Sequence, residues 1–191
     1  MNARASAVAG WAAGLLAVAG AAQAATAWKS DAAASRLEFV ATQAGGEFDG
    51  RFARFDTEVV LDPAEPKASR LRVQIETASA ETGDDQRDEA LRGPDFLAAG
   101  RWPLATFTAD RVVPRGPDRF EALGTLTIRG VAKEVRLPFV FSVQADAARA
   151  EMTGGTTIRR LDFGVGQGEW LDTEWVGDEV HVRFRLILHR K

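Results

Sequence analysis

The stretch Asp84–Phe107 reads DDQRDEALRGPDFLAAGRWPLATF, and it predicts the one helix of a chain that otherwise alternates apolar and polar residues. Asp84 or Asp85 can cap this helix, because an aspartate oxygen accepts hydrogen bonds from the first free backbone N–H groups. Gly93-Pro94 is expected to end it, since proline lacks an N–H and clashes with the preceding turn. The stretch therefore predicts a short helical segment with defined ends.

This stretch has three large apolar side chains, Leu91, Phe96 and Leu97, which is too many for a segment that is fully exposed to water. Apolar side chains are stabilised by removal from water, so we expect these three to pack on the rest of the protein. The helical segment is therefore predicted to form a lid on a β framework.

Strand patterns precede and follow the lid. Apolar residues fall at every second position in Leu37–Ala41 and again in Val180–Leu188, as in strands that bury one face. Apolar residues fall at even positions up to Phe52 and at odd positions from Phe55 onward. Because strand side chains alternate between two faces, this change requires an extra residue and predicts a β-bulge or bend near Ala53-Arg54. Roughly eight such segments predict an all-β fold, which closes as a barrel or stacks as a sandwich.

The first 24 residues have the features of a secretory signal peptide. Arg4 gives a weak positive start, Ala7–Ala19 is an apolar run, and Ala22-Gln23-Ala24 offers small residues for cleavage. We expect residues 1–24 to be removed and residues 25–191 to form a single domain in the periplasm. An uncleaved membrane anchor is the alternative, although the apolar run is short for a membrane span.

Composition argues against several function classes. A net charge of −3 gives no concentrated basic surface for nucleic acid, and the absence of cysteine excludes disulfides and thiol catalysis. His181 and His189 fall at the same alternate positions as the arginines of their predicted strand, so we expect both on a solvated face and not in a metal site. Gly164–Gly168 resembles part of a phosphate loop but is not followed by a helix. No nucleophile, base and orienting group can be proposed together, so catalysis, metals and cofactors are not expected.

Three sequence blocks resemble the YceI-like family of polyisoprenoid-binding proteins. The first is the lid segment, with Arg87-Asp88, Leu91-Arg92, Asp95-Phe96-Leu97, Trp102-Pro103 and Ala105-Thr106-Phe107; the second is Gly124–Lys133, and the third is Leu161–Gly166. The sequence departs from the family pattern at Gly93-Pro94, and at Ala34, where the family often has a histidine before the serine. The resemblance implies an eight-stranded antiparallel lipocalin-like barrel with a short helical lid, enclosing a long isoprenoid chain.

Inward-facing apolar residues have two interpretations. Taken alone, the aromatic residues favour an ordinary filled core, whereas the resemblance favours a ligand cavity. The residues expected to contact the ligand are Phe39, Phe48, Phe52, Val73, Ile75, Leu91, Phe96, Leu97, Phe107, Phe120, Leu126, Leu137, Phe139, Phe141, Met152 and Ile158.

The leading hypothesis is a periplasmic, non-enzymatic protein that holds or carries an isoprenoid quinone or another long-chain amphiphilic lipid. That lipid is the expected ligand and partner, and a membrane or respiratory-chain partner and a homodimer are further hypotheses. The alternatives are a lipid-modifying enzyme, or an interaction module with a filled core in which Trp170 and Trp175 form a protein-binding surface.

Overall fold

The computed structural model describes residues 26–61, 63 and 65–191. The predicted signal peptide, residues 1–24, lies outside the described residues. The strands are β1 (Ala27–Ser30), β2 (Arg36–Gln43), β3 (Gly46–Phe52), β4 (Phe55–Val60), β5 (Arg70–Glu76), β6 (Ala80–Glu81), β7 (Leu104–Pro114), β8 (Arg119–Ile128), β9 (Val131–Val143), β10 (Arg149–Arg159) and β11 (Glu179–Arg190). The helix α1 spans Asp85–Arg92, and four 3-10 turns are η1 (Pro66–Ala68), η2 (Thr77–Ser79), η3 (Arg160–Phe163) and η4 (Gly168–Leu171).

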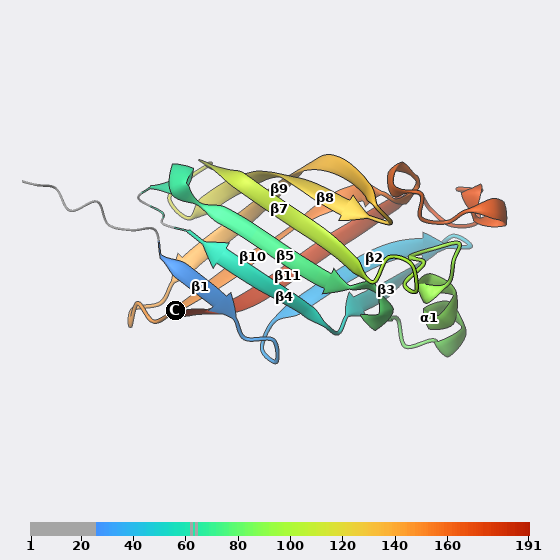
Figure 1. Ribbon diagram of the computed structural model, residues 1–191, viewed down its shortest axis with the longest axis horizontal. Helices are drawn as coiled ribbons and strands as arrows, with labels where there is room; N and C mark the ends of the chain where they lie inside the picture. The colour runs from blue at the N-terminus through green and yellow to red at the C-terminus, as the bar shows by residue number, and fades with distance from the viewer. Residues whose placement is uncertain (1–25, 62, 64) are drawn as a thin grey trace, which may run out of the picture.

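These strands form an eight-stranded antiparallel barrel with one short helix, as predicted. Three of the eight barrel strands are interrupted: β1 continues as β2, β3 continues as β4, and β5 continues as β6. The ring closes where β1 pairs with both β4 and β11, and where β2 pairs with β11. Figure 1 shows the long, tilted strands wrapping around one axis, with β1 and the C-terminus at one end and α1 at the other.

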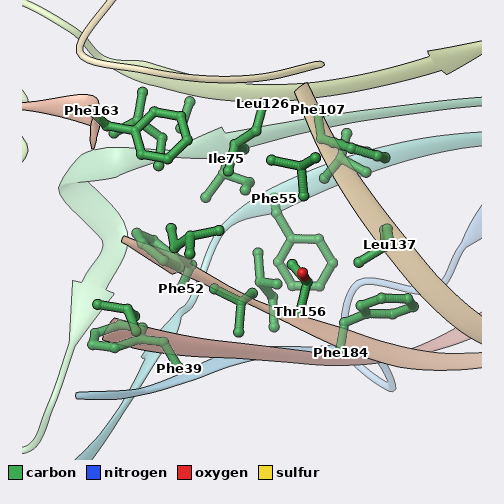
Figure 2. Close-up of a pocket in the computed structure, with 18 of the residues that line it drawn as sticks. Phe39, Phe52, Phe55, Ile75, Phe107, Leu126, Leu137, Thr156, Phe163 and Phe184 are labelled. Carbon is green, nitrogen blue, oxygen red and sulfur yellow. The ribbon is translucent and has the colours of Figure 1, made fainter. Parts of the chain in front are cut away.

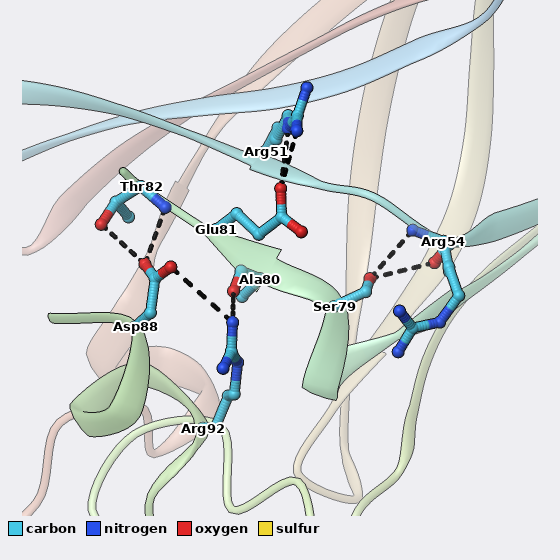
Figure 3. Close-up of polar contacts among 8 residues, drawn as sticks. All are labelled: Arg51, Arg54, Ser79, Ala80, Glu81, Thr82, Asp88 and Arg92. Atoms are coloured by element: carbon cyan, nitrogen blue, oxygen red, sulfur yellow. Dashed lines mark hydrogen bonds and ion pairs between the residues drawn. The ribbon is translucent and has the colours of Figure 1, made fainter. Parts of the chain in front are cut away.

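The predicted bend at Ala53-Arg54 is confirmed, because β3 ends at Phe52 and β4 begins at Phe55. This interruption lies beside the one between β5 and β6. The Ala53 and Arg54 N–H groups donate to the backbone oxygen and the Oγ of Ser79, at 3.0 and 3.1 Å. Figure 3 shows this side chain taking the place of a strand partner at the bend. The paired interruptions let both strands bend without leaving these backbone groups unpaired.

Helix α1 is fixed to the barrel by charged side chains (Figure 3). Asp84 caps it by accepting a hydrogen bond from the Arg87 N–H at 3.0 Å. The buried Asp88 accepts from both the N–H and the hydroxyl of Thr82, each at 2.7 Å, and Arg92 Nη2 donates to the Ala80 carbonyl at 2.7 Å. The lid is therefore held at one orientation on β6. Among the described helices, none is long and apolar enough to cross a membrane.

The end of the barrel opposite α1 is filled with side chains. Phe120 and Phe139 stack with ring centroids 5.6 Å apart, and Trp28 meets Phe141 edge-on at the same separation. Trp28 Nε1 donates to the Leu61 carbonyl at 3.3 Å, which satisfies its buried polar group. We call this the filled end.

Candidate functional site

The other half of the barrel, beneath the lid, contains a cavity of about 210 Å³ as traced by the centre of a water-sized sphere. Figure 2 shows aromatic and aliphatic side chains from many strands around it. Its polar lining residues are Thr57, Thr156 and Arg160, and all of its other lining residues are apolar. Such a site favours the apolar part of a ligand, because an apolar surface offers no partner for a hydrated polar group.

Thirteen of the sixteen residues predicted to contact a ligand line this cavity. They are Phe39, Phe48, Phe52, Val73, Ile75, Leu91, Phe96, Leu97, Phe107, Leu126, Leu137, Met152 and Ile158. The other three, Phe120, Phe139 and Phe141, face inward as expected but lie in the filled end, where each is at most 3% exposed. The inward-facing aromatic residues therefore divide into two groups that alternation along the strands does not separate.

Three phenylalanine rings that line the cavity lie over glycines of neighbouring strands. Phe39 is paired across strands with Gly50, and a methyl group on Gly50 would lie 2.6 Å from Phe39 Cε1. Phe184 lies over its partner Gly154 in the same way, and Phe107 lies over Gly124. The missing Cβ atoms let these rings lie against the wall instead of projecting across the barrel. All three rings line the cavity.

The lid closes one end of the cavity through Leu91, Phe96 and Leu97. Phe96 packs on Trp170 with ring centroids 5.4 Å apart. Hydrogen bonds also hold the segment after α1: the N–H groups of Gly166 and Gln167 donate to the Asp95 carbonyl at 2.7 and 2.9 Å. The lid and the loop after η3 therefore form one connected cover.

Arg160 is the charged residue that lines the cavity, and it was not predicted. It is 4% exposed, and its guanidinium donates to backbone carbonyls of Gly177 at 3.0 Å, Val165 at 2.9 Å and Val176 at 2.7 Å. Burial lowers the pKa of this guanidinium, and the nearby Asp178 carboxylate opposes the shift. An arginine remains protonated at neutral pH, so a fixed positive charge lies buried in the wall and is held by loop carbonyls, while the surface that faces the cavity is apolar.

Alternation along a strand could have identified some of the cavity residues that were not predicted, but not all of them. Val182 and Phe184 follow the alternation of β11, and Leu186 continues it. Val165 and Val176 lie in loops, where no period marks an inward side chain.

Acidic and histidine side chains do not gather into a metal site in the described part of the chain. His181 is exposed, with Nδ1 2.7 Å from the Thr157 hydroxyl, and His189 Nε2 lies 3.7 Å from Asp31. Both histidines thus lie on the outer face that alternation predicted.

Comparisons with known proteins agree with this architecture. The YceI-like domain family matches residues 28–188. A UPF0312 protein of Azotobacter vinelandii is 35% identical over 120 residues, which cover 61% of this chain and about 62% of that protein's length. The crystal structure of Burkholderia cenocepacia BcnA superposes with a TM-score of 0.79 at 33% identity, covering 83% of this chain and 98% of that chain.

A polyisoprenoid binding domain from Saccharophagus degradans, implicated in plant cell wall breakdown, superposes with a TM-score of 0.69. It covers 87% of this chain and 99% of that chain. At 20% identity, this likeness concerns the fold.

Proposed function

The chain belongs to the YceI-like family, and from this we propose that its barrel holds the apolar tail of a long-chain isoprenoid lipid or quinone. The observation that carries the proposal is the hollow half of the barrel, whose wall is apolar except at three residues. A fold relative is a polyisoprenoid binding domain, which supports the same ligand class. Each methylene buried in such a cavity contributes roughly 0.8 kcal/mol, so a long tail binds without specific polar partners.

We propose that the protein binds its lipid without catalysing a reaction on it. Arg160 is the titratable side chain in the described cavity wall, and a guanidinium does not serve as a general base because it stays protonated. Carboxylates and histidines near the cavity would be needed for acid–base chemistry on a bound lipid. We propose that the protein acts in the periplasm, with residues 1–24 removed.

The test compares two neighbouring residues of β10 that face opposite ways. Thr156 lines the cavity and projects into it in Figure 2, whereas Thr157 is exposed on the outer face. The wild type, Thr156→Trp and Thr157→Trp are purified from the periplasmic fraction, and intact mass gives the mature N-terminus. Organic extraction and mass spectrometry then measure the lipid carried by each protein.

We expect an N-terminus at Ala25 and one class of long-chain lipid in the wild type. Thr156→Trp fills the cavity and should reduce that lipid at least about tenfold, which corresponds to about 1.4 kcal/mol of lost affinity. Thr157→Trp should retain it. A wild type free of lipid, or equal lipid in both variants, would contradict the proposed binding site.

A further inference from the structure

The strand pairing of the barrel wall has a gap between two of its interrupted strands. Pairing of β1 with β4 stops at Lys29, and pairing of β2 with β3 resumes only at Glu38. Between these points, none of the described backbone hydrogen bonds joins residues 30–37 to residues 52–57. We call the gap between these two stretches the seam.

Backbone groups on both edges of the seam are bonded to other neighbours. On one edge, the Asp31 N–H donates to the Ile187 carbonyl of β11 at 2.8 Å, and the Asp31 carbonyl accepts from the Ser35 N–H at 2.9 Å. On the other edge, the Ala53 N–H donates to the Ser79 carbonyl at 3.0 Å. The seam therefore stays open without leaving these groups unpaired.

A second cavity lies at the seam. Its volume is about 180 Å³, traced in the same way as that of the first cavity, and we call it the outer pocket. One edge contributes Ser35, Arg36 and Leu37 to its lining, and the other contributes Arg51, Phe52 and Phe55. Leu37, Phe52 and Phe55 also line the cavity beneath the lid, where Figure 2 shows the two phenylalanine rings. These three side chains therefore form a boundary that the two cavities share.

The outer pocket differs from the cavity beneath the lid because charged side chains stand at its rim. Arg36 and Arg51 are both exposed. Arg36 Nη1 donates to the carbonyls of Ala33 and Ser35 at 2.8 and 2.7 Å, and Arg51 forms an ion pair with Glu81 at 2.8 Å. A polar group in this pocket can keep its contact with water, whereas the apolar surface beneath the lid offers it no partner.

Both ends of the barrel are covered in the described structure. At the lid end, Phe96 packs on Trp170 and joins the lid to the loop after η3. At the opposite end, Phe120 and Phe139 stack in the packed core. The seam, in contrast, brings an apolar cavity and a pocket with a polar rim together at one boundary.

We propose that the seam is the mouth of the binding site. The tail of the lipid enters between Leu37, Phe52 and Phe55, and the polar end of the bound lipid stays in the outer pocket. This inference rests on the proposed function, since it assumes a tail in the cavity beneath the lid. It defines the ligand as an amphiphile whose polar end remains at the protein surface. Entry under the lid is the alternative that the experiment must separate.

The chain contains no cysteine, so a single introduced thiol reports on one position. Ala32→Cys and Ala53→Cys place a thiol on the two edges of the outer pocket. Leu171→Cys places one in η4, next to the residue on which the lid packs, and Ala132→Cys places one on β9 as the control. All four residues are exposed, so each variant should fold.

Each mature variant is treated with hexadecyl methanethiosulfonate, and separately with methyl methanethiosulfonate to measure the reactivity of the thiol alone. The thiolate forms a disulfide with the alkylthio group and displaces methanesulfinate, and intact mass follows the reaction. Binding of the hexadecyl reagent to the wild type, which has no thiol, is measured by displacement of the dye N-phenyl-1-naphthylamine.

A tail in the cavity should hold the reactive end of the hexadecyl reagent at the mouth and raise its effective concentration there. We therefore expect the ratio of the hexadecyl rate to the methyl rate to be at least about tenfold higher at Ala32→Cys, Ala53→Cys or both than at Ala132→Cys. Leu171→Cys should match the control.

The outcomes separate the two proposals. A higher ratio at Leu171→Cys than at both seam positions places the polar end under the lid and overturns this inference. Binding of the hexadecyl reagent to the wild type, with neither seam position above the control, also overturns it and leaves lipid binding intact. Failure of the wild type to bind the dye and the reagent overturns the proposed function and this inference with it.

Discussion

At the filled end, Phe120 stacks on Phe139 and Trp28 packs against Phe141, whereas in the half of the barrel beneath the lid, here called the lid half, eight phenylalanine rings surround the cavity. Both halves are lined by apolar residues of the same strands, so hydrophobicity does not distinguish them. What differs is the packing of the interior. In the lid half the rings of Phe39, Phe107 and Phe184 lie over Gly50, Gly124 and Gly154 and line the cavity, whereas at the filled end Phe120, Phe139 and Phe141 are at most 3% exposed in a packed core.

This contrast separates stability from binding within one barrel. Side chains packed to the density of a crystal lose many contacts when truncated, whereas those facing an existing cavity lose fewer. We therefore expect the filled end to carry most of the folding free energy and the lid half to carry the ligand. Substitutions in the two halves should therefore differ in how they change stability and lipid content.

Phe139→Ala should be the most damaging change. Phe139 is 3% exposed and stacked on Phe120, so its truncation leaves a closed void and should cost about 3–5 kcal/mol of unfolding free energy. The lipid carried per folded molecule should not change. Chemical denaturation and lipid extraction measure both quantities.

Phe55→Ala is the matched control for this change. Phe55 is half-buried and lines the cavity, so its loss should cost less stability and more lipid. If Phe139→Ala lost lipid while remaining as stable as Phe55→Ala, the ligand would reach into the filled end and the division would be wrong.

Phe96→Ala should have an intermediate effect. Phe96 is 8% exposed and packs on Trp170, but it also faces the cavity, so we expect a loss of about 2–3 kcal/mol, below the range for a fully packed phenylalanine. Lipid content should fall as well, because the lid loses its main contact. Trp175→Ala, at a residue 52% exposed on the neighbouring loop, should change neither. A stability loss with full lipid content would make the lid a structural element only.

Much of the fold could be predicted from the sequence because strands and caps are local features. Alternation with a period of two located the strands, and the change of parity located the bend at Ala53-Arg54. Asp84 and Gly93 marked the ends of α1 because capping depends on residues within one turn. Alternation alone left barrel and sandwich open, because closure depends on which distant strands pair.

The division of the interior could not be predicted in this way. Phe39 and Phe139 have the same alternating context, and each is paired with a glycine on a neighbouring strand, so neither the pattern nor the pairing alone separates a ring that lines the cavity from a ring in the core. Arg160 was missed for a related reason: a charged residue after a strand is expected to be exposed, and its carbonyl acceptors Val176 and Gly177 lie 16 and 17 residues away. These features depend on register and on loop positions that a single sequence does not state.

Gly50→Ala should have the smallest effect on stability and a large effect on lipid binding. The three atoms nearest to the new methyl group all belong to the ring of Phe39, which is the end of a side chain and can swing into the hollow half. Overpacking usually costs about 1–3 kcal/mol, but the empty space beside this ring and the roughly 0.5–1 kcal/mol gained by replacing a strand glycine should bring the net change near zero.

Two other glycine substitutions complete the comparison. Gly46→Ala lies on the same strand, where a methyl group would meet the Gln43 carbonyl at an ordinary 3.7 Å, so it should keep both stability and lipid. Gly154→Ala would collide with the Pro138 carbonyl, and because backbone cannot swing aside, that variant should be destabilised. Thermal denaturation and lipid extraction of the three variants distinguish these results. A Gly50→Ala protein that keeps its lipid would show that the position of the Phe39 ring on the wall is not what keeps the binding cavity open.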